Sequence, residues 1–358
     1  MPKRHQVEHG SPASGENIPQ RLKRGVVADC NVQAEVWTYP RCNSQGGVRK
    51  LGMSLRMIAV DLDGTLLGVD GRVGARNRAA LLAAQQAGVV IAIATGRRHC
   101  YALHVLREVG LDDSTVLVSS NGAVVRDIAS TLIERTLMES DTARWLCGHL
   151  GEFRDALVIT FDRVGPDGED ARGALVVEEF AVLEESIAHW MRNNDRYIEH
   201  VRPIEQALAG DAPIQMMLCG TVERMRRAEA RLVQHERVSP VGEVREGDWI
   251  SLNRTEYPVR DLSILDILPA GCSKGAALLR VAAARGFSGT EMMAIGDNWN
   301  DLSMLEVAGS PVLMGNAPED LQAMATQRGW VMTATNLDDG VAEVVETALT
   351  VGVGAGSK

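Results

Sequence analysis

The stretch MIAVDLDGT, residues 57–65, joins four apolar residues to a tight turn that carries two aspartates. The apolar residues predict a short buried strand, which Asp61 and Asp63 follow directly. Ligands bind at the carboxyl ends of strands in open α/β sheets, so both carboxylates are expected at a ligand-binding edge. Asp61 could bind a metal ion and attack phosphorus while Asp63 handles protons. The alternative is a turn that merely caps the next helix.

Two parts of the chain, residues 55–132 and 267–350, show the same pattern. Short runs of Val, Ile and Ala alternate with Ala- and Leu-rich segments whose apolar residues have helical spacing. Runs that are apolar on both faces are typical of a parallel sheet covered by helices on both sides. We therefore expect an α/β fold with a doubly wound, Rossmann-like parallel-sheet core. Its expected strands are residues 57–60, 89–94, 116–119, 292–295 and 311–314, and its expected helices are residues 75–87, 274–285, 301–308 and 340–349.

Between these two parts, residues 133–266 change character and predict an inserted α+β cap domain with its own sheet. The catalytic core is then discontinuous and consists of residues 55–132 and 267–350. The expected cap strands are residues 157–161, 174–180, 214–219 and 249–253, and the expected cap helices are residues 183–193 and 222–234.

The two ends of the chain predict no packed structure. Residues 1–54 are rich in Gly, Ser, Pro, Asn and Gln and sustain no hydrophobic period, so we expect a disordered N-terminal tail. Residues 351–358 are expected to form a flexible C-terminal tail.

Two further segments suggest phosphate binding. Thr95-Gly96-Arg97 follows the expected strand 89–94, where a hydroxyl and exposed backbone N–H groups could cradle a phosphoryl group. Lys274 opens a helix, where the helix dipole disfavours a cation, so an anionic ligand would explain its position. The alternatives are an ordinary strand-to-helix cap and a solvated lysine.

The segment Gly296-Asp297-Asn298-Trp299-Asn300-Asp301 suggests a metal site. Asp297 ends a strand and Asp301 starts the next helix, so the two acids could face one cation. Hard oxygen ligands of this kind suit Mg²⁺, which keeps waters and shares substrate phosphate oxygens. The alternative is a helix start rich in capping residues.

Composition excludes several other classes of function. The formal net charge of −10 and the pI near 5.4 argue against nucleic acid as a partner. The six cysteines are scattered without metal-ligand spacing, which favours reduced thiols and a cytoplasmic protein over a zinc site or disulfide framework. No apolar run reaches the roughly 18–20 residues that cross a bilayer, so no membrane partner is expected.

The four motifs in this order, with a large insertion between the second and the third, resemble the haloacid dehalogenase (HAD) superfamily and within it the Cof-type phosphatases. The resemblance covers about residues 55–349, with a C2-type cap. It implies that Asp61 is the nucleophile and a Mg²⁺ ligand, and that Asp63 is the acid/base with its carbonyl on the metal. Asp297 would be the remaining direct ligand, and Asp301 would support the metal through its neighbours.

The resemblance also assigns the phosphate-binding groups. These would be Leu62, Thr95, Gly96, Lys274 and Asn300, while Arg97 and Trp299 are possible substrate contacts. The implied function is a Mg²⁺-dependent hydrolase of small phosphate monoesters, such as a sugar phosphate or a phosphorylated cofactor, which passes through an aspartyl-phosphate. The cap would set selectivity. The alternatives are a phosphotransferase or phosphomutase with the same nucleophile, or a non-catalytic protein that binds a phosphorylated metabolite. The sequence names neither the substrate nor the oligomeric state.

Overall fold

The computed structural model describes residues 55–165, 167–179, 191–257 and 261–353. The N-terminal tail expected over residues 1–54 lies outside these ranges, as does most of the helix expected over residues 183–193. Among the described residues, every helix is too short or too polar to cross a bilayer.

An eight-stranded sheet has the order β14-β13-β12-β1-β2-β3-β4-β5. The strands from β14 to β3 run parallel, and β4 and β5 add an antiparallel hairpin at one edge. The parallel core predicted from the sequence is therefore confirmed, whereas the hairpin was not expected. The strands are β1 (Met57–Val60), β2 (Val90–Ala94), β3 (Val116–Ser119), β4 (Val124–Asp127), β5 (Leu132–Arg135), β12 (Met292–Gly296), β13 (Ser310–Leu313) and β14 (Val331–Met332).

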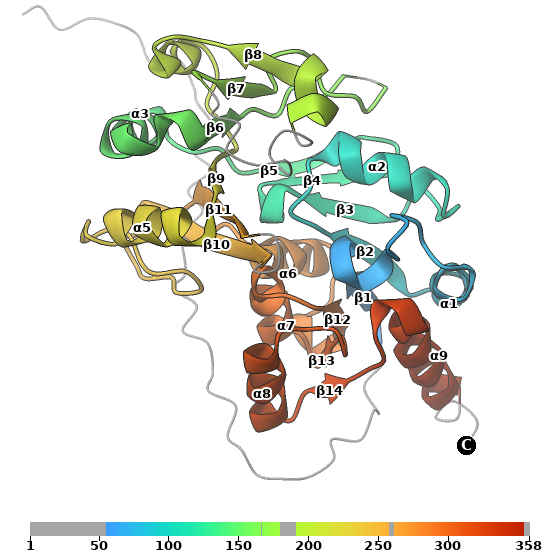
Figure 1. The fold of residues 1–358 in the computed structure, drawn as a ribbon. Helices are drawn as coiled ribbons and strands as arrows, with labels where there is room; N and C mark the ends of the chain where they lie inside the picture. The colour runs from blue at the N-terminus through green and yellow to red at the C-terminus, as the bar shows by residue number, and fades with distance from the viewer. Residues whose placement is uncertain (1–54, 166, 180–190, 258–260, 354–358) are drawn as a thin grey trace, which may run out of the picture. The chain divides into compact units, whose positions relative to one another are not determined.

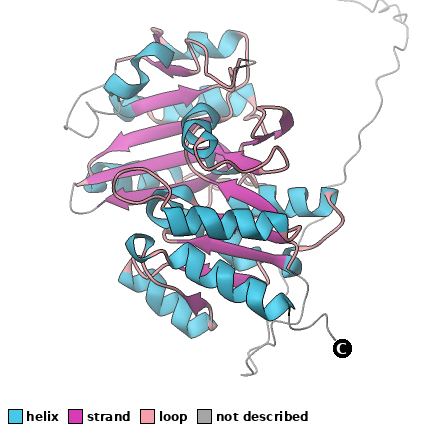
Figure 2. Ribbon diagram, turned by 90° about the vertical axis from the view of Figure 1, so that its right-hand side faces the viewer, coloured by secondary structure: helices cyan, strands magenta, loops and turns pink. Residues whose placement is uncertain are grey.

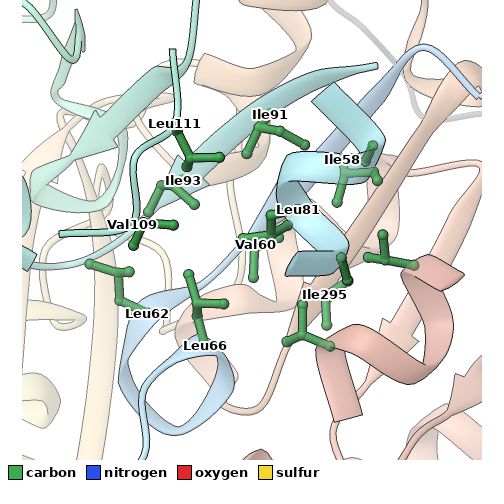
Figure 3. Packing of buried hydrophobic residues seen from close by; sticks show 14 of the residues in the cluster. Ile58, Val60, Leu62, Leu66, Leu81, Ile91, Ile93, Val109, Leu111 and Ile295 are labelled. Carbon is green, nitrogen blue, oxygen red and sulfur yellow. The ribbon is translucent and has the colours of Figure 1, made fainter. Parts of the chain in front are cut away.

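Strand β1 contributes side chains to both faces of this sheet. Ile58 and Val60 pack with helices α1, α2 and α9, whereas Met57 and Ala59 pack with helices α6, α7 and α8. Figure 3 shows the first of these clusters around Ile58 and Val60. All four side chains are fully buried, and burying an Ile or Val side chain contributes about 1.5–3 kcal/mol. The helices are α1 (Ala75–Gln86), α2 (His99–Arg107), α6 (Lys274–Ala284), α7 (Leu302–Val307), α8 (Glu319–Arg328) and α9 (Gly340–Val353).

A second, six-stranded sheet has the order β10-β11-β9-β6-β7-β8, and the segment that carries it is called the cap below (Figures 1 and 2). One face of the sheet packs against helices α3 and α5, with Leu265 and Ile267 of β11 in the shared cluster. The cap elements are α3 (Ser140–His149), β6 (Leu157–Thr160), β7 (Leu175–Val177), β8 (Ile198–His200), β9 (Gln215–Gly220), α5 (Val222–Leu232), β10 (Ile250–Tyr257) and β11 (Leu262–Pro269).

The chain passes from one sheet to the other at residues that differ from the expected boundaries of the cap, residues 133 and 266. Residues 133–135 belong to β5 in the eight-stranded sheet, because Arg135 pairs with Val124. Residues 267–269 belong to β11 in the six-stranded sheet, because Pro269 pairs with Ile250. The division of the chain into structural domains at these points stays a prediction. Helix α9 continues to Val353, so residues 351–353 of the expected C-terminal tail are helical, and residues 354–358 lie outside the described ranges.

Candidate active site

Three of the predicted motifs meet because their strands are neighbours. Strand β1 lies between β2 and β12 and runs parallel to both (Figure 1). Asp61 follows β1, Thr95 follows β2 and Asp297 follows β12, so all three residues leave the sheet at the same edge. Parallel pairing therefore brings together side chains that lie more than 200 residues apart in the sequence, as Asp61 and Asp297 do.

Lys274 lies at the centre of the site. Its Nζ atom donates to Asp61 Oδ1 and to Asp301 Oδ1, both at 2.6 Å. Lys274 and Asp301 are both 0% exposed. A buried charge is tolerated only when it is paired and hydrogen-bonded, and Lys274 satisfies this condition with two carboxylates. The lysine at the helix start is thus buried and paired, which rules out the solvated lysine considered for this position.

The carboxylates of the site raise one another's pKa. Burial first, and then the charge of Asp301, raises the pKa of Asp61 well above its usual range, although Lys274 opposes the shift. Burial and Asp301 raise the pKa of Asp297 to about 7. Burial alone would lower the pKa of Lys274, but Asp301 and Asp61 outweigh it and raise the pKa. The site has more buried negative charge than Lys274 balances.

Three of these carboxylates could share a metal ion. Asp61, Asp297 and Asp301 each offer an oxygen, and these oxygens lie within 4.8 Å of one another. The unbalanced acidity and the all-oxygen donor set fit a hard divalent cation such as Mg²⁺. The carboxylate of Asp63, the fourth predicted metal residue, is paired with Arg97 and is not part of this group of three.

Asp301 also shapes the loop that carries Asp297. Its Oδ2 atom accepts from the backbone N–H of Asp297 at 3.0 Å and of Asn298 at 3.1 Å. Gly296 makes room for it, since a Cβ there would lie 2.6 Å from the Cβ of Asp301. The capping function that the sequence left as an alternative is therefore real, and the same side chain also holds Lys274.

Asp63 and Arg97 form a bidentate ion pair. Arg97 Nε donates to Asp63 Oδ2 at 2.7 Å and Arg97 Nη2 donates to Asp63 Oδ1 at 2.5 Å. The Asp63 side chain is 49% exposed, so this pair lies at the open side of the site. Both carboxylate oxygens of Asp63 therefore accept hydrogen bonds from Arg97.

The turn after Asp61 is built around Asp297. Gly64 has a φ of +80°, and a Cβ there would lie 2.4 Å from Asp297 Oδ2. Thr65 Oγ1 donates to Asp297 Oδ1 at 2.8 Å. Asn316 Nδ2 donates to the Gly64 carbonyl at 2.8 Å. Glycine is therefore required at position 64 by its backbone conformation and by the close approach of a carboxylate.

The turn Ser120–Gly122 is hydrogen-bonded to the Thr95-Gly96 loop and supports it. The Asn121 backbone N–H donates to the Thr95 carbonyl at 3.0 Å, and the Ser120 N–H donates to the Arg97 carbonyl at 2.9 Å. A Cβ at Gly96 would lie 3.2 Å from Asn121 Oδ1. Asn121 itself has a φ of +53°, a conformation that asparagine tolerates better than most residues.

The remaining predicted residues lie around this centre. The Leu62 side chain is fully buried in the apolar core, so only its main chain can reach a phosphate. Trp299 is half-buried and packs against the cluster under α6 and α7. Asn300 is half-buried beside it in a short 3-10 turn, Trp299–Asp301.

Four residues of the site were not singled out for chemistry from the sequence. Thr65 and Asn316 hold the Asp61 turn, and Asn121 supports the Thr95-Gly96 loop. Asp266 of β11 accepts from Asn121 Nδ2 at 2.9 Å. The sequence carries a signal for two of them: Thr65 ends the DLDGT run, and Asn121-Gly122 is a turn signal after a strand.

Comparison with known proteins identifies a family and several similar proteins. Residues 58–345 match the family model of haloacid dehalogenase-like hydrolases. The chain is 29% identical to 5-amino-6-(5-phospho-D-ribitylamino)uracil phosphatase YwtE of Bacillus subtilis, over 82% of this chain and 98% of the relative. It is 28% identical to the HMP-PP phosphatase of Serratia proteamaculans, over 76% of this chain and 88% of the relative.

Solved structures give the same fold. A haloacid dehalogenase-like hydrolase from Bacteroides thetaiotaomicron superposes with a TM-score of 0.62 at 24% identity, over 82% of this chain and 99% of that chain. The family model covers far more than half of the sequence, and the named relatives are phosphatases. The chain therefore belongs to the haloacid dehalogenase-like hydrolases.

Proposed function

We propose that this chain is a Mg²⁺-dependent phosphatase that hydrolyses small phosphate monoesters through an aspartyl-phosphate on Asp61. The observation that carries the proposal is the fully buried Lys274, which lies 2.6 Å from both Asp61 and Asp301. An ion pair this deep at the end of a strand serves poorly as a simple structural contact, because removing charges from water is expensive. With a bound cation to offset the excess negative charge of the carboxylates, Lys274 would bind an oxygen of a phosphoryl group.

The residues present fit a magnesium ion. Asp61 and Asp297 would hold it directly, together with the backbone carbonyl of Asp63, and Asp301 would fix the loop that carries Asp297. When bound, Mg²⁺ would offset the negative charge of the phosphoryl oxygens and of the carboxylates around them.

Asp61 and Asp63 divide the chemistry. Asp61 Oδ attacks phosphorus, the bond from phosphorus to the ester oxygen breaks, and Asp63 gives a proton to the departing alcohol. Asp63 then takes a proton from water as the water oxygen attacks phosphorus, which breaks the bond to Asp61 and releases inorganic phosphate. Thr95 Oγ1, the Gly96 N–H and Lys274 would bind the phosphoryl oxygens during both steps, with Asn300 and the Leu62 N–H beside them.

Arg97 would change partners during this cycle. In the structure it occupies both oxygens of Asp63. An incoming phosphate or an anionic leaving group offers a competing acceptor for the guanidinium, and this exchange would free Asp63 to transfer protons. Trp299 would serve mainly as packing beside the loop, and contacts that select the leaving group would come from the cap.

The substrate class is a small phosphorylated metabolite, as the phosphatase names of the relatives suggest. The proposal places the protein in the cytoplasm, as its scattered cysteines favour. The specific ester is left to experiment, because the residues described above would contact only phosphate and metal.

A panel of phosphate monoesters, including sugar phosphates and phosphorylated cofactors, tests the proposal with and without Mg²⁺. We expect Mg²⁺-dependent release of inorganic phosphate from at least one ester, and a loss of at least about 10³-fold in kcat for Asp61→Asn. The matched control is Asp113→Asn, an exposed loop aspartate whose substitution should leave turnover unchanged. Absence of turnover across the panel would instead indicate a protein that binds a phosphorylated metabolite without hydrolysing it.

The same assay separates hydrolysis from phosphoryl transfer. If phosphate release requires a sugar acceptor or a bisphosphate activator, the phosphotransferase or phosphomutase alternative replaces the hydrolase. A hydrolase releases phosphate at the same rate without either.

A further inference from the structure

A buried side-chain pair joins the cap to the turn Ser120–Gly122, which supports the Thr95-Gly96 loop. Asn121 Nδ2 donates to Asp266 Oδ2 at 2.9 Å, and Asp266 belongs to strand β11 of the cap sheet. Both residues are buried, with exposures of 1% and 6%. Breaking a buried hydrogen bond leaves polar groups unpaired away from water, so this pair links the cap sheet firmly to the turn Ser120–Gly122.

Asp266 is itself held in place from within the cap. Its other oxygen, Oδ1, accepts from Gln215 Nε2 of strand β9 at 3.2 Å. Asp266 faces away from the apolar cluster that contains its neighbours Leu265 and Ile267, because side chains alternate along a strand. A carboxylate buried between two amides has its position set by the cap sheet, and it sets the orientation of the Asn121 amide in turn.

Asn121 in turn contacts the Thr95-Gly96 loop. It lies against Gly96 so closely that a Cβ there would be 3.2 Å from Asn121 Oδ1, and the Asn121 N–H holds the Thr95 carbonyl. Asn121 Oδ1 is buried and has no hydrogen-bond partner among the described residues, so Asp266 is the group that fixes this amide.

The turn that carries Asn121 also touches the start of helix α6. Gly122 has a φ of +101°, and a Cβ there would lie 2.2 Å from the carbonyl oxygen of Ser273. Ser273 is the N-cap residue of α6 and directly precedes Lys274. The turn Ser120–Gly122 therefore contacts two of the phosphate-binding elements, and the cap holds this turn through Asp266.

We infer that Asp266 is a positioning residue, through which the cap fixes Asn121 and hence the Thr95-Gly96 loop that binds the phosphoryl group. The inference rests on the proposed phosphatase function, since it concerns the same site. Asp266 touches no reacting atom. It acts through Asn121, so the effects of losing either residue should overlap rather than multiply.

A double-mutant cycle with Asp266→Leu and Asn121→Gly tests this inference. Glycine is chosen at position 121 because it accepts the positive φ, so the amide is removed with little backbone strain. We expect kcat/KM to fall about tenfold in each single variant and also about tenfold in the double variant. A fall of about a hundredfold in the double variant would show independent roles and overturn the inference.

Two further readouts distinguish positioning from a contact with the leaving group. The ratio of kcat/KM between two esters with different leaving groups should stay constant in all three variants. The inhibition constant of inorganic phosphate, which has no leaving group, should rise by a factor similar to the loss in kcat/KM. A changed ratio with an unchanged phosphate inhibition constant would assign Asp266 to leaving-group recognition and contradict the inference.

Controls keep folding and function apart. Asp195→Leu replaces an exposed aspartate of the cap and should change none of these values. If Asp266→Leu does not fold, the cycle is run with Asp266→Asn, which keeps the shape and one acceptor and should show the same overlap with smaller losses. Wild type that hydrolyses no ester would contradict the proposed function, whereas an active wild type with multiplying effects would contradict only the role of Asp266.

Discussion

At the scale of single residues, Lys274 supplies the positive charge that the buried carboxylates need. Its ammonium group is the fully buried cation between Asp61 and Asp301. Without it, two carboxylates would stay buried beside a third, Asp297, whose pKa is already raised to about 7 by burial and by Asp301. Stability therefore depends on the same charge that the proposed function assigns to phosphate binding.

We expect Lys274→Met to lower the free energy of unfolding by about 3–5 kcal/mol, because it leaves buried carboxylates unpaired. Urea unfolding in the presence of EDTA measures this loss. Added Mg²⁺ should restore part of the stability, since a cation can replace the missing charge, but should not restore turnover. Arg72→Met, at an exposed position, is the control. An unchanged unfolding midpoint for Lys274→Met would mean that the ion pair has no net role in stability.

At the scale of elements, the groups that the proposed function uses follow the end of a strand or lie at the start of a helix. The turn after β1 illustrates the constraint, because its φ of +80° at Gly64 and the nearby Asp297 carboxylate allow no side chain. The same holds for Gly122 against Ser273. Glycines at these junctions allow separate elements to approach one another closely.

Gly64→Ala should therefore displace Asp297, and the Mg²⁺ concentration for half-maximal activity should rise at least about tenfold. Gly71→Ala is the matched control, because Gly71 has a similar φ of +72° but no atom within 4 Å of the position that a Cβ would take. Both variants should lose about 1 kcal/mol of stability from the backbone strain. Equal Mg²⁺ requirements in the two variants would show that the contact with Asp297 does not matter.

On the scale of the whole molecule, the proposed metal binding would be linked to folding. The carboxylates that would hold Mg²⁺ come from residues 61, 297 and 301, which only the folded chain brings together. A ligand that binds the folded state alone stabilises it. Mg²⁺ should raise the melting temperature of wild type, and this rise should largely disappear in Asp297→Asn. Calorimetry with EDTA and with millimolar Mg²⁺ measures it, and an equal rise in both proteins would place the metal elsewhere.

The buried Asp266 should make stability depend on pH. Burial raises its pKa to about 7, above the usual 3.8 of an aspartate. Between these two pH values the folded chain binds more protons than the unfolded chain, so the free energy of unfolding falls as the pH rises from about 4 to about 7. Above pH 7 both states have lost the proton, and the contribution levels off.

Asp266→Asn removes this contribution, so the stability difference between the variant and wild type should move in favour of the variant from pH 4 to pH 7. A change of about 4 kcal/mol is expected, since the pKa of Asp266 rises from 3.8 to about 7 and one pKa unit corresponds to about 1.4 kcal/mol. Urea unfolding at several pH values, without metal, measures it. A difference that stays constant with pH would show that Asp266 ionises in the folded chain as an ordinary aspartate does.

Particular elements show what could be predicted and why. The strands at residues 57–60 and 116–119 were expected with their observed bounds, because continuous short apolar runs are typical of the buried strands of a parallel sheet. Strand β11 was missed because Asp266 interrupts its apolar run, and the β4–β5 hairpin was missed because β5 is largely exposed. A strand whose pattern is broken by a functional charge or by solvent exposure leaves little local signal.

The sequence by itself determined where the motifs lie along the chain, because residue types and their place after apolar runs are local properties, and it predicted the chemistry of those motifs. It placed Asp61, Asp63, Thr95, Lys274 and Asp297 at the ends of their elements. Only the tertiary structure decided that Asp63 is paired with Arg97, that Asp301 holds both Lys274 and the Asp297 loop, and that Asp266 of the cap reaches Asn121. The reason is physical: hydrogen bonds and ion pairs depend on distances of about 3 Å, and the packing of distant segments sets those distances.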